Sequence, residues 1–328
     1  MNLAGELSRK RFGMFAWAVL AYNIPVILWG AYVRVSFSGD GCGANWPFCA
    51  GQIIPQHMAA PMAIEFTHRL MTSVDSFAVI AMCLWAFLAF PRRHAVRLYS
   101  IASLIFLFVE ALLGAGLVLL RYVAKDQSAG RAVYLSAHLT NTMLLLAALT
   151  VTAWLAYTNT ERIRVSDIPR GIAGALFATV IVSITGAVAA LGDTLFPAAS
   201  LTSGMQQDFS STSNMLLRLR MVHPAIAVIG AAYLIWIAVI VLKQHERQAA
   251  HSAATRVLMV TIFQVAVGMM NITLLAPIWM QLFHLLVADV VWIAVVVMAL
   301  EMTQMKAGLR LDGKTPQANL GEVERFIG

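Results

Sequence analysis

The sequence predicts an all-α integral membrane protein whose eight transmembrane helices form two repeated four-helix bundles. Its 328 residues are 60% hydrophobic with a mean hydropathy of +0.76, and only 12% are charged. Soluble domains carry about 25% charged residues, so this composition excludes a soluble enzyme. The net charge of +7 does not indicate a nucleic-acid partner, because the basic residues lie in short loops between apolar runs.

Eight apolar runs are long enough to cross a bilayer. A hydrocarbon core about 30 Å thick needs about 20 helical residues. The first run is too long for the apolar part of a signal peptide, so we expect it to remain as a helix. The expected spans are residues 12–33, 70–90, 98–120, 133–157, 172–191, 221–242, 257–276 and 278–300.

The distribution of cations predicts the orientation of these spans. Lys and Arg gather before the first span and in every second loop, whereas residues 35–67 and 192–217 contain neither. Cytoplasmic loops collect Lys and Arg. We therefore expect both termini in the cytoplasm, the two cation-free loops outside, and the chain in a bacterial plasma membrane.

The two halves of the chain resemble each other at matching points, as expected of a repeat. Four spans in each half give both halves the same orientation, so we expect an axis along the membrane normal to relate them. The predicted units are residues 1–157 with an external loop at 35–67, residues 158–303, and a cytoplasmic tail at 304–328. The matching pairs are Gly30 with Gly186, Glu110 with Gln264, Gly114 with Gly268, His68 with His223, and His138 with His284.

Four histidines, His68, His138, His223 and His284, are each expected in the first two turns of a span that runs inward. Membrane histidines usually face the bundle interior, and two facing histidines on different helices can clamp a haem iron. The alternative is that each hydrogen-bonds a neighbouring helix. Zinc fits less well, because the histidines are divided between two bundles with no Cys in reach. We expect two haem-sized sites, one at His68 and His138 and one at His223 and His284.

The two halves differ beside their first histidine. Glu65 lies three residues before His68 and so on the same helical face, whereas Arg220 holds the matching position before His223. This difference predicts chemistry in the first half and a cofactor in the second. The alternative is that Glu65 is a helix N-terminal charge at the membrane surface. Three further intramembrane acids fit either a proton path or an interhelical contact: Asp75, Glu110 and Asp289.

Cys42 and Cys49 lie seven positions apart in the first external loop. An exterior compartment favours their oxidation, so we expect a disulfide, although the spacing does not distinguish a structural staple from a redox pair. Cys83 is expected to be a small core residue. Several arginines near the expected external face run against the charge bias, and haem propionates would explain some of them: Arg34, Arg69, Arg121, Arg131, Arg218 and Arg220.

These motifs closely resemble the haem A synthase family over residues 12–303. The resemblance rests on Gly-Cys-Gly-Ala-Asn-Trp-Pro-Phe-Cys-Ala-Gly-Gln at 41–52, Glu-Phe-Thr-His-Arg at 65–69, and the single histidine in three later spans. It implies an oxidoreductase that converts the C8 methyl of haem O to the formyl of haem A for terminal oxidases. It also implies that His68 and His138 bind the substrate haem, that His223 and His284 ligate a haem b iron, and that Glu65 is catalytic. Residues 192–219 contain no Cys, so the second external Cys pair of some members is absent.

The implied partners are the substrate haem O, a haem O synthase, a cytochrome oxidase assembly pathway and membrane lipid, with a second copy of the chain left open. One alternative is a membrane cytochrome with two haems b that passes electrons to or from quinone. It would use the same histidines but would not need Glu65 or the Cys loop. The repeat alone also suits a transporter, but mid-membrane breaks at Gly or Pro in both halves are not evident.

Overall fold

The computed structural model describes residues 3–210, 214–244 and 247–311, and these are helical apart from connecting loops. Eight helices are long and apolar enough to cross a membrane, which confirms the predicted fold class of an all-helical, multi-pass membrane protein. The helices are α1 (Leu3–Val35), α2 (Ala60–Ala89), α3 (Ala95–Leu119), α4 (Ala129–Thr158), the 3₁₀ turn η1 (Val165–Asp167), α5 (Arg170–Leu195), the short α6 (Leu201–Phe209), α7 (Met215–Gln244), α8 (Gln248–Thr273) and α9 (Ile278–Leu311).

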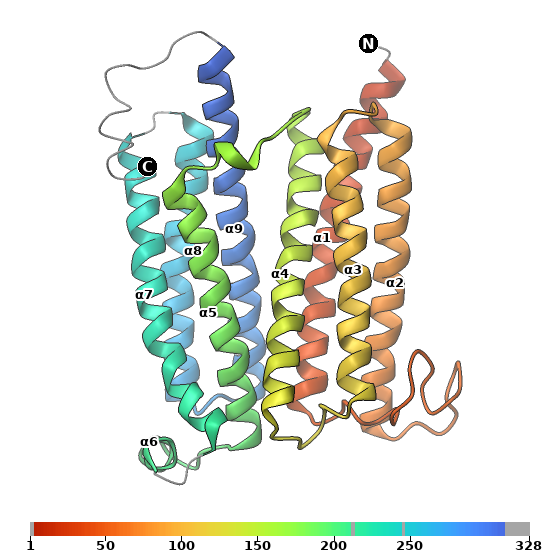
Figure 1. Ribbon diagram of the computed structural model, residues 1–328, viewed down its shortest axis with the longest axis vertical. Coiled ribbons are helices and arrows are strands. Elements are labelled where there is room, and N and C mark those ends of the chain that lie inside the picture. The colour runs from red at the N-terminus through yellow and green to blue at the C-terminus, as the bar shows by residue number, and fades with distance from the viewer. Residues whose placement is uncertain (1–2, 211–213, 245–246, 312–328) are drawn as a thin grey trace.

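The long helices form two four-helix groups that stand side by side (Figure 1). In the first group each helix contacts the next and α4 closes the ring on α1; α5, α7, α8 and α9 form a second ring in the same way. The groups meet where α1 and α4 pack against α5 and α9. The relation of the halves by an axis along the membrane normal remains a prediction.

Each group has its own apolar core. Phe12, Met82 and Leu149 are fully buried in the first, and Ile237 and Val295 in the second. Large apolar side chains also cover the outer surface, as expected where lipid rather than water surrounds the helices.

Indole hydrogen bonds join the two groups across their interface. Trp292 Nε1 donates to the Met143 carbonyl at 2.7 Å, and Trp154 Nε1 donates to Glu301 Oε1 at 2.9 Å. Polar groups at membrane depth have no water to bind, so each such bond satisfies a donor that would otherwise be costly to bury. These contacts fix α4, the most buried of the spans, against α9.

Three helices differ from the apolar runs that predicted them. α2 begins at Ala60, with Pro61 in its first turn, so residues 60–67 of the predicted loop are helical. The hydropathy pattern did not predict this start, because the polar side chains of the first turns of α2 are buried against the loop and do not face lipid. α9 continues to Leu311, so the predicted tail begins inside a helix, and residues 312–328 lie outside the described residues. Residues 201–209, predicted as loop, form α6 behind a capping box at Ser200.

The helix starts also correct the depth of the histidines. His284 lies in the second turn of its helix, as predicted, but the other three lie in the third turn: His68, His138 and His223. The loop with Cys42 and Cys49, and α6, lie at the same end of the bundle, at the bottom of Figure 1. We call this end the disulfide end.

We expect single cysteines placed at Ile53 and Ser203 to be labelled from outside intact cells by a membrane-impermeant maleimide, because both positions lie at the disulfide end. A cysteine at Arg93, in the loop at the opposite end, should be labelled only after permeabilisation. Labelling of Ile53→Cys and Ser203→Cys from opposite sides would contradict the fold, and labelling of both from inside would reverse the predicted orientation.

Candidate functional site

The four histidines alternate with glycine-bearing helices around the two rings. In each case the imidazole lies beside a glycine on the preceding helix of its ring. A Cβ added to the glycine would stand 3.0 or 3.1 Å from a ring carbon in three pairs and 3.9 Å from a ring nitrogen in the fourth. The pairs are Gly30 with His68, Gly114 with His138, Gly186 with His223, and Gly268 with His284.

In three of these pairs the imidazole lies where a side chain on the glycine would need to be. Three of the four glycines could not become alanine without moving an imidazole, since real Cβ contacts are rarely so short. The sequence showed that these glycines repeat, but it gave no sign that they contact the histidines. All four rings remain half-buried, so each has an open side.

The ring separation in the second half suits a shared iron. The ring centres of His223 and His284 lie 6.5 Å apart. A metal bound by two imidazole nitrogens at about 2 Å each requires ring centres about 6 Å apart. These two residues therefore fit the axial ligands of a haem, and in the first half His68 and His138 occupy the corresponding positions on α2 and α4.

The histidines differ in what holds their Nδ1 atoms. His138 Nδ1 lies 3.0 Å from Glu110 Oε1, whereas His223 Nδ1 lies 3.1 Å from the Thr185 hydroxyl. Within the described residues, the Nδ1 atoms of His68, His138 and His284 have no hydrogen-bond partner, and the Glu110 carboxylate meets His138 Nδ1 at ion-pair distance only. Glu110 is thus an interhelical partner of a predicted ligand, and Thr185 is a contact that sequence reasoning missed.

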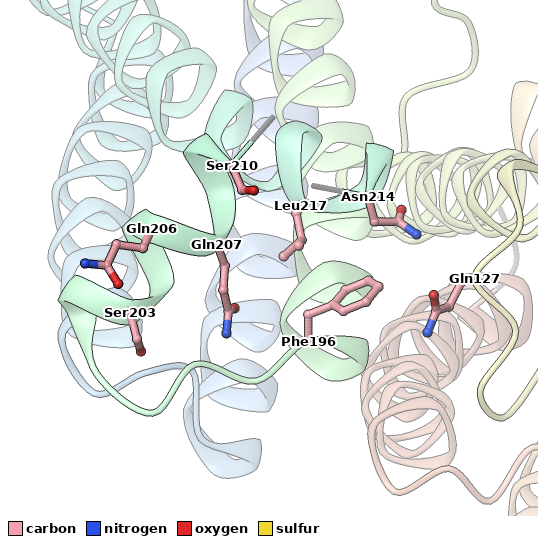
Figure 2. Close-up of a pocket in the computed structure, with 8 residues that line it drawn as sticks. All are labelled: Gln127, Phe196, Ser203, Gln206, Gln207, Ser210, Asn214 and Leu217. Atoms are coloured by element: carbon pink, nitrogen blue, oxygen red, sulfur yellow. The ribbon is translucent and has the colours of Figure 1, made fainter. Parts of the chain in front are cut away.

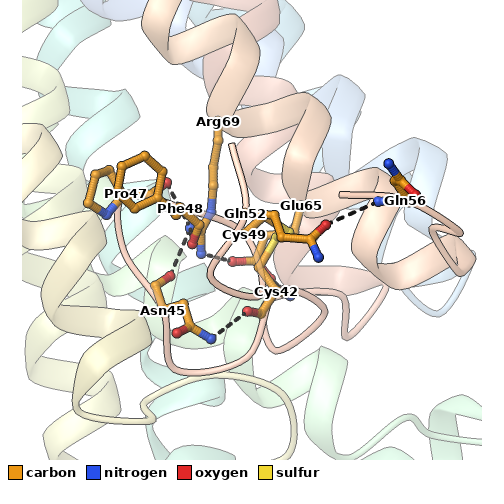
Figure 3. Close-up of a disulfide and its surroundings, with 9 residues drawn as sticks. All are labelled: Cys42, Asn45, Pro47, Phe48, Cys49, Gln52, Gln56, Glu65 and Arg69. Atoms are coloured by element: carbon orange, nitrogen blue, oxygen red, sulfur yellow. Dashed lines mark hydrogen bonds and ion pairs between the residues drawn. A yellow bond between two sulfur atoms is a disulfide. The ribbon is translucent and has the colours of Figure 1, made fainter. Parts of the chain in front are cut away.

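Glu65 attaches the external loop to α2 (Figure 3). Its side chain is buried, and its two oxygens accept hydrogen bonds from the Cys42 backbone N–H at 2.8 Å and from Arg69 at 2.5 Å. Cys42 and Cys49 form the expected disulfide. Glu65 is therefore covered by the loop rather than exposed to solvent, and its catalytic role stays a prediction.

Arg69 completes this attachment. One of its guanidinium nitrogens donates to the carbonyls of Asn45, Pro47 and Phe48 at 2.8–3.2 Å, while the other binds Glu65. Gly41 allows the loop to approach, since a Cβ there would stand 2.5 Å from the Pro61 backbone. The loop is therefore held over the helix that carries His68.

In the second half, a positively charged guanidinium takes the place of the Glu65 carboxylate in holding the external loop. Arg220, on α7 three residues before His223, forms ion pairs with Asp193 at 3.2 Å and Asp208 at 2.5 Å. It also donates to the Phe196 carbonyl at 3.2 Å. A carboxylate stands beside the first histidine of one half and a guanidinium beside that of the other, and both bind the neighbouring external loop.

Other polar groups along the helices mostly bind protein atoms. Arg34 donates to the Ala190 carbonyl and the Thr194 hydroxyl, both at 2.7 Å, and so links α1 to α5. Asp75 accepts a hydrogen bond from Asn23 at 2.9 Å. Asp289 is buried, and its Oδ2 has no hydrogen-bond partner among the described residues.

A polar cavity of about 660 Å³ opens at the disulfide end beside α6 (Figure 2). Amide side chains from Gln127, Gln206, Gln207 and Asn214 line it, together with Phe196 and others. None of the predicted site residues contributes to its lining, so it is separate from the histidine sites.

We expect Arg69→Ala to release the disulfide loop locally. Each lost charge-assisted hydrogen bond contributes about 1.5–3 kcal/mol when buried, and less where water reaches Arg69, so amide hydrogen exchange in residues 42–52 should accelerate about tenfold. Arg220→Ala is the matched control, because it should accelerate exchange in α6 and leave residues 42–52 unchanged. Equal effects on both loops in either variant would contradict these separate attachments.

Comparison with known proteins places this sequence in a family. The sequence profile of the family described as "Cytochrome oxidase assembly protein" (COX15-CtaA) matches residues 13–296. A protein of Thermus thermophilus named "Protoheme IX farnesyltransferase" is 38% identical over 295 residues, which cover 88% of this chain and 48% of that protein. The chain thus spans about half the length of this relative.

Shorter matches connect the chain with proteins named "Heme A synthase". The protein of an Exiguobacterium species is 32% identical over 110 residues, which cover 34% of this chain and 36% of that protein. The protein of Lysinibacillus sphaericus is 37% identical over 105 residues, or 32% and 34% of the two chains. These matches confirm the resemblance that the motifs indicated, and the chain belongs to the COX15-CtaA family of cytochrome oxidase assembly proteins.

Proposed function

We propose that this chain is a haem A synthase, an oxidoreductase that converts the C8 methyl of haem O to the formyl group of haem A. The observation that carries the proposal is that, among the described residues, only the first pair of histidines has beside it a buried carboxylate that binds a disulfide loop. A protein that only transfers electrons between two haems has no need of this difference. Family membership and the relatives named for haem A synthesis support the same reaction.

The second half is proposed to hold a resident haem b between His223 and His284. Their ring separation suits a shared iron, and Gly186 and Gly268 let the two imidazoles pack closely against the neighbouring helices. When bound, this cofactor would accept or deliver electrons one at a time. The Thr185 hydroxyl orients His223 from behind.

The first half is proposed to bind haem O between His68 and His138. Glu65 lies one helical turn before His68 and is proposed to accept protons released as the methyl is oxidised. Arg69 stabilises its ionised form and, with the Cys42 N–H, fixes the direction of the carboxylate. The disulfide loop would cover this end of the site and limit access of water.

The substrate class agrees with both sets of relatives. Haem O is a farnesylated haem, and the Thermus relative is named for attaching a farnesyl group to protohaem. We propose that a haem O synthase supplies the substrate, that the product serves a terminal oxidase, and that the chain acts in a bacterial plasma membrane with both termini in the cytoplasm. The lipid phase gives the apolar tail of haem O a lateral route to the first helix group.

Glu65→Gln should abolish haem A formation while the haem at His223 and His284 is retained. The amide preserves size but cannot take up a proton, and a general base typically contributes about 100- to 10,000-fold. The measurement is the ratio of haem A to haem O in cells that have no other copy of the enzyme.

Arg69→Ala serves as the control, because it loosens the same loop but keeps the carboxylate. It should retain more activity than Glu65→Gln. Wild-type haem A levels in Glu65→Gln would contradict the proposed catalytic role of Glu65. A wild-type protein that farnesylates protohaem from an activated farnesyl donor, and leaves haem O unchanged, would instead favour the activity named for the Thermus relative.

His223→Ala and His284→Ala should each remove the low-spin haem b spectrum of the purified protein. Loss of an axial ligand opens the iron, but the apolar helices still insert in the membrane. His57→Ala, at an exposed loop position, is the matched control and should keep the spectrum. An unchanged spectrum in both ligand variants would show that the resident haem lies elsewhere.

A further inference from the structure

Residues of α4 hold the carboxylate of Glu110, on α3, with one oxygen against His138. Oε1 lies 3.0 Å from His138 Nδ1 and also accepts from the Thr142 hydroxyl, and Oε2 accepts from Asn141 Nδ2 at 2.5 Å. All three contacts come from α4, within about one helical turn. The carboxylate therefore cannot leave His138 without losing its other partners.

This arrangement determines which nitrogen of His138 is available. With the carboxylate 3.0 Å from Nδ1, the proton of the neutral ring is favoured on Nδ1 and the lone pair on Nε2, the atom that faces Gly114. An anionic acceptor behind an imidazole makes the ring a stronger electron donor to a metal, and it places a negative charge near that metal. Both effects stabilise the more highly charged oxidation state of iron.

The second half lacks this feature at both of its histidines. The Thr185 hydroxyl behind His223 is neutral. Gln264, which holds the sequence position that matches Glu110, donates its amide to the His284 carbonyl at 3.2 Å. Among the described residues, only the first half places a carboxylate behind a proposed haem ligand.

We propose that Glu110 is a positioning residue that acts through His138, so that iron bound in the first half favours the ferric state more strongly than iron bound in the second. The inference rests on the proposed function, because it requires a haem iron at His138. It gives the two sites different electronic roles: an electron-rich ligand supports oxidation of the bound substrate, and neutral ligands support electron transfer.

The test is the midpoint potential of each haem in the purified protein, with haem O supplied to the first site. Glu110→Gln keeps an oxygen that can accept from Nδ1–H but removes the charge. Loss of such a partner typically weakens metal affinity 10- to 100-fold. A tenfold loss of ferric over ferrous preference corresponds to a rise of about 59 mV for this one-electron couple. We expect a rise of at least this size in the first haem and none in the second.

Two variants in the other half provide controls. Thr185→Val removes a neutral group. It should therefore change the ferric over ferrous preference of the second haem by less than tenfold and leave that of the first haem unchanged. Thr185→Asp places a carboxylate near His223 Nδ1 and should lower the potential of the second haem. This reciprocal variant needs neither an occupied first site nor a folded Glu110→Gln protein.

The outcomes separate the inference from the proposed function. An unchanged first potential in Glu110→Gln, an unchanged second potential in Thr185→Asp, or a first site that binds no haem would each overturn the inference. A wild-type protein that shows the predicted potentials, yet makes no haem A from haem O, would contradict the proposed function alone.

Discussion

The close packing of four imidazoles against glycines is the constraint on which the arrangement of this protein depends. Each ring lies against a glycine of the preceding helix in its bundle, and in three cases a single methyl group there would collide with the ring. An imidazole is costly at membrane depth unless it binds something. The glycines therefore let each imidazole pack directly against the neighbouring helix, and the alternation of histidine and glycine helices gives both halves the same arrangement.

The differences between the halves concern charge rather than shape. Glu65 and Arg220 each lie three residues before a histidine, and each anchors the loop outside its own bundle, one to backbone N–H and the other to aspartates. Behind the histidines, Glu110 faces His138 whereas Thr185 faces His223. One scaffold thus carries two electrostatic environments. We propose that this difference lets the first half oxidise its bound haem, whereas the second half only exchanges electrons with the first.

The sequence predicted the membrane-spanning helices well because they depend on strong, local signals. Long apolar runs fix the number of spans, and a lone membrane histidine stands out against them. It placed the start of α2 ten residues late, since Glu65, His68 and Arg69 interrupt the apolar run yet are helical through contacts with a distant loop. Tertiary contacts such as Thr185 with His223, or Arg34 with the end of α5, have no periodic signal and could not be predicted. The disulfide could, because its two cysteines are close in sequence.

The pigments extracted from the purified protein test the central claim most directly. The account predicts one haem b for each chain together with haem O or haem A, because the two halves bind different haems for different purposes. Acid extraction and chromatography with mass detection distinguish these haems without any assumption about the site. Two equivalents of haem b, with neither haem O nor haem A even when haem O is abundant in the cell, would contradict the account and indicate a cytochrome that only transfers electrons.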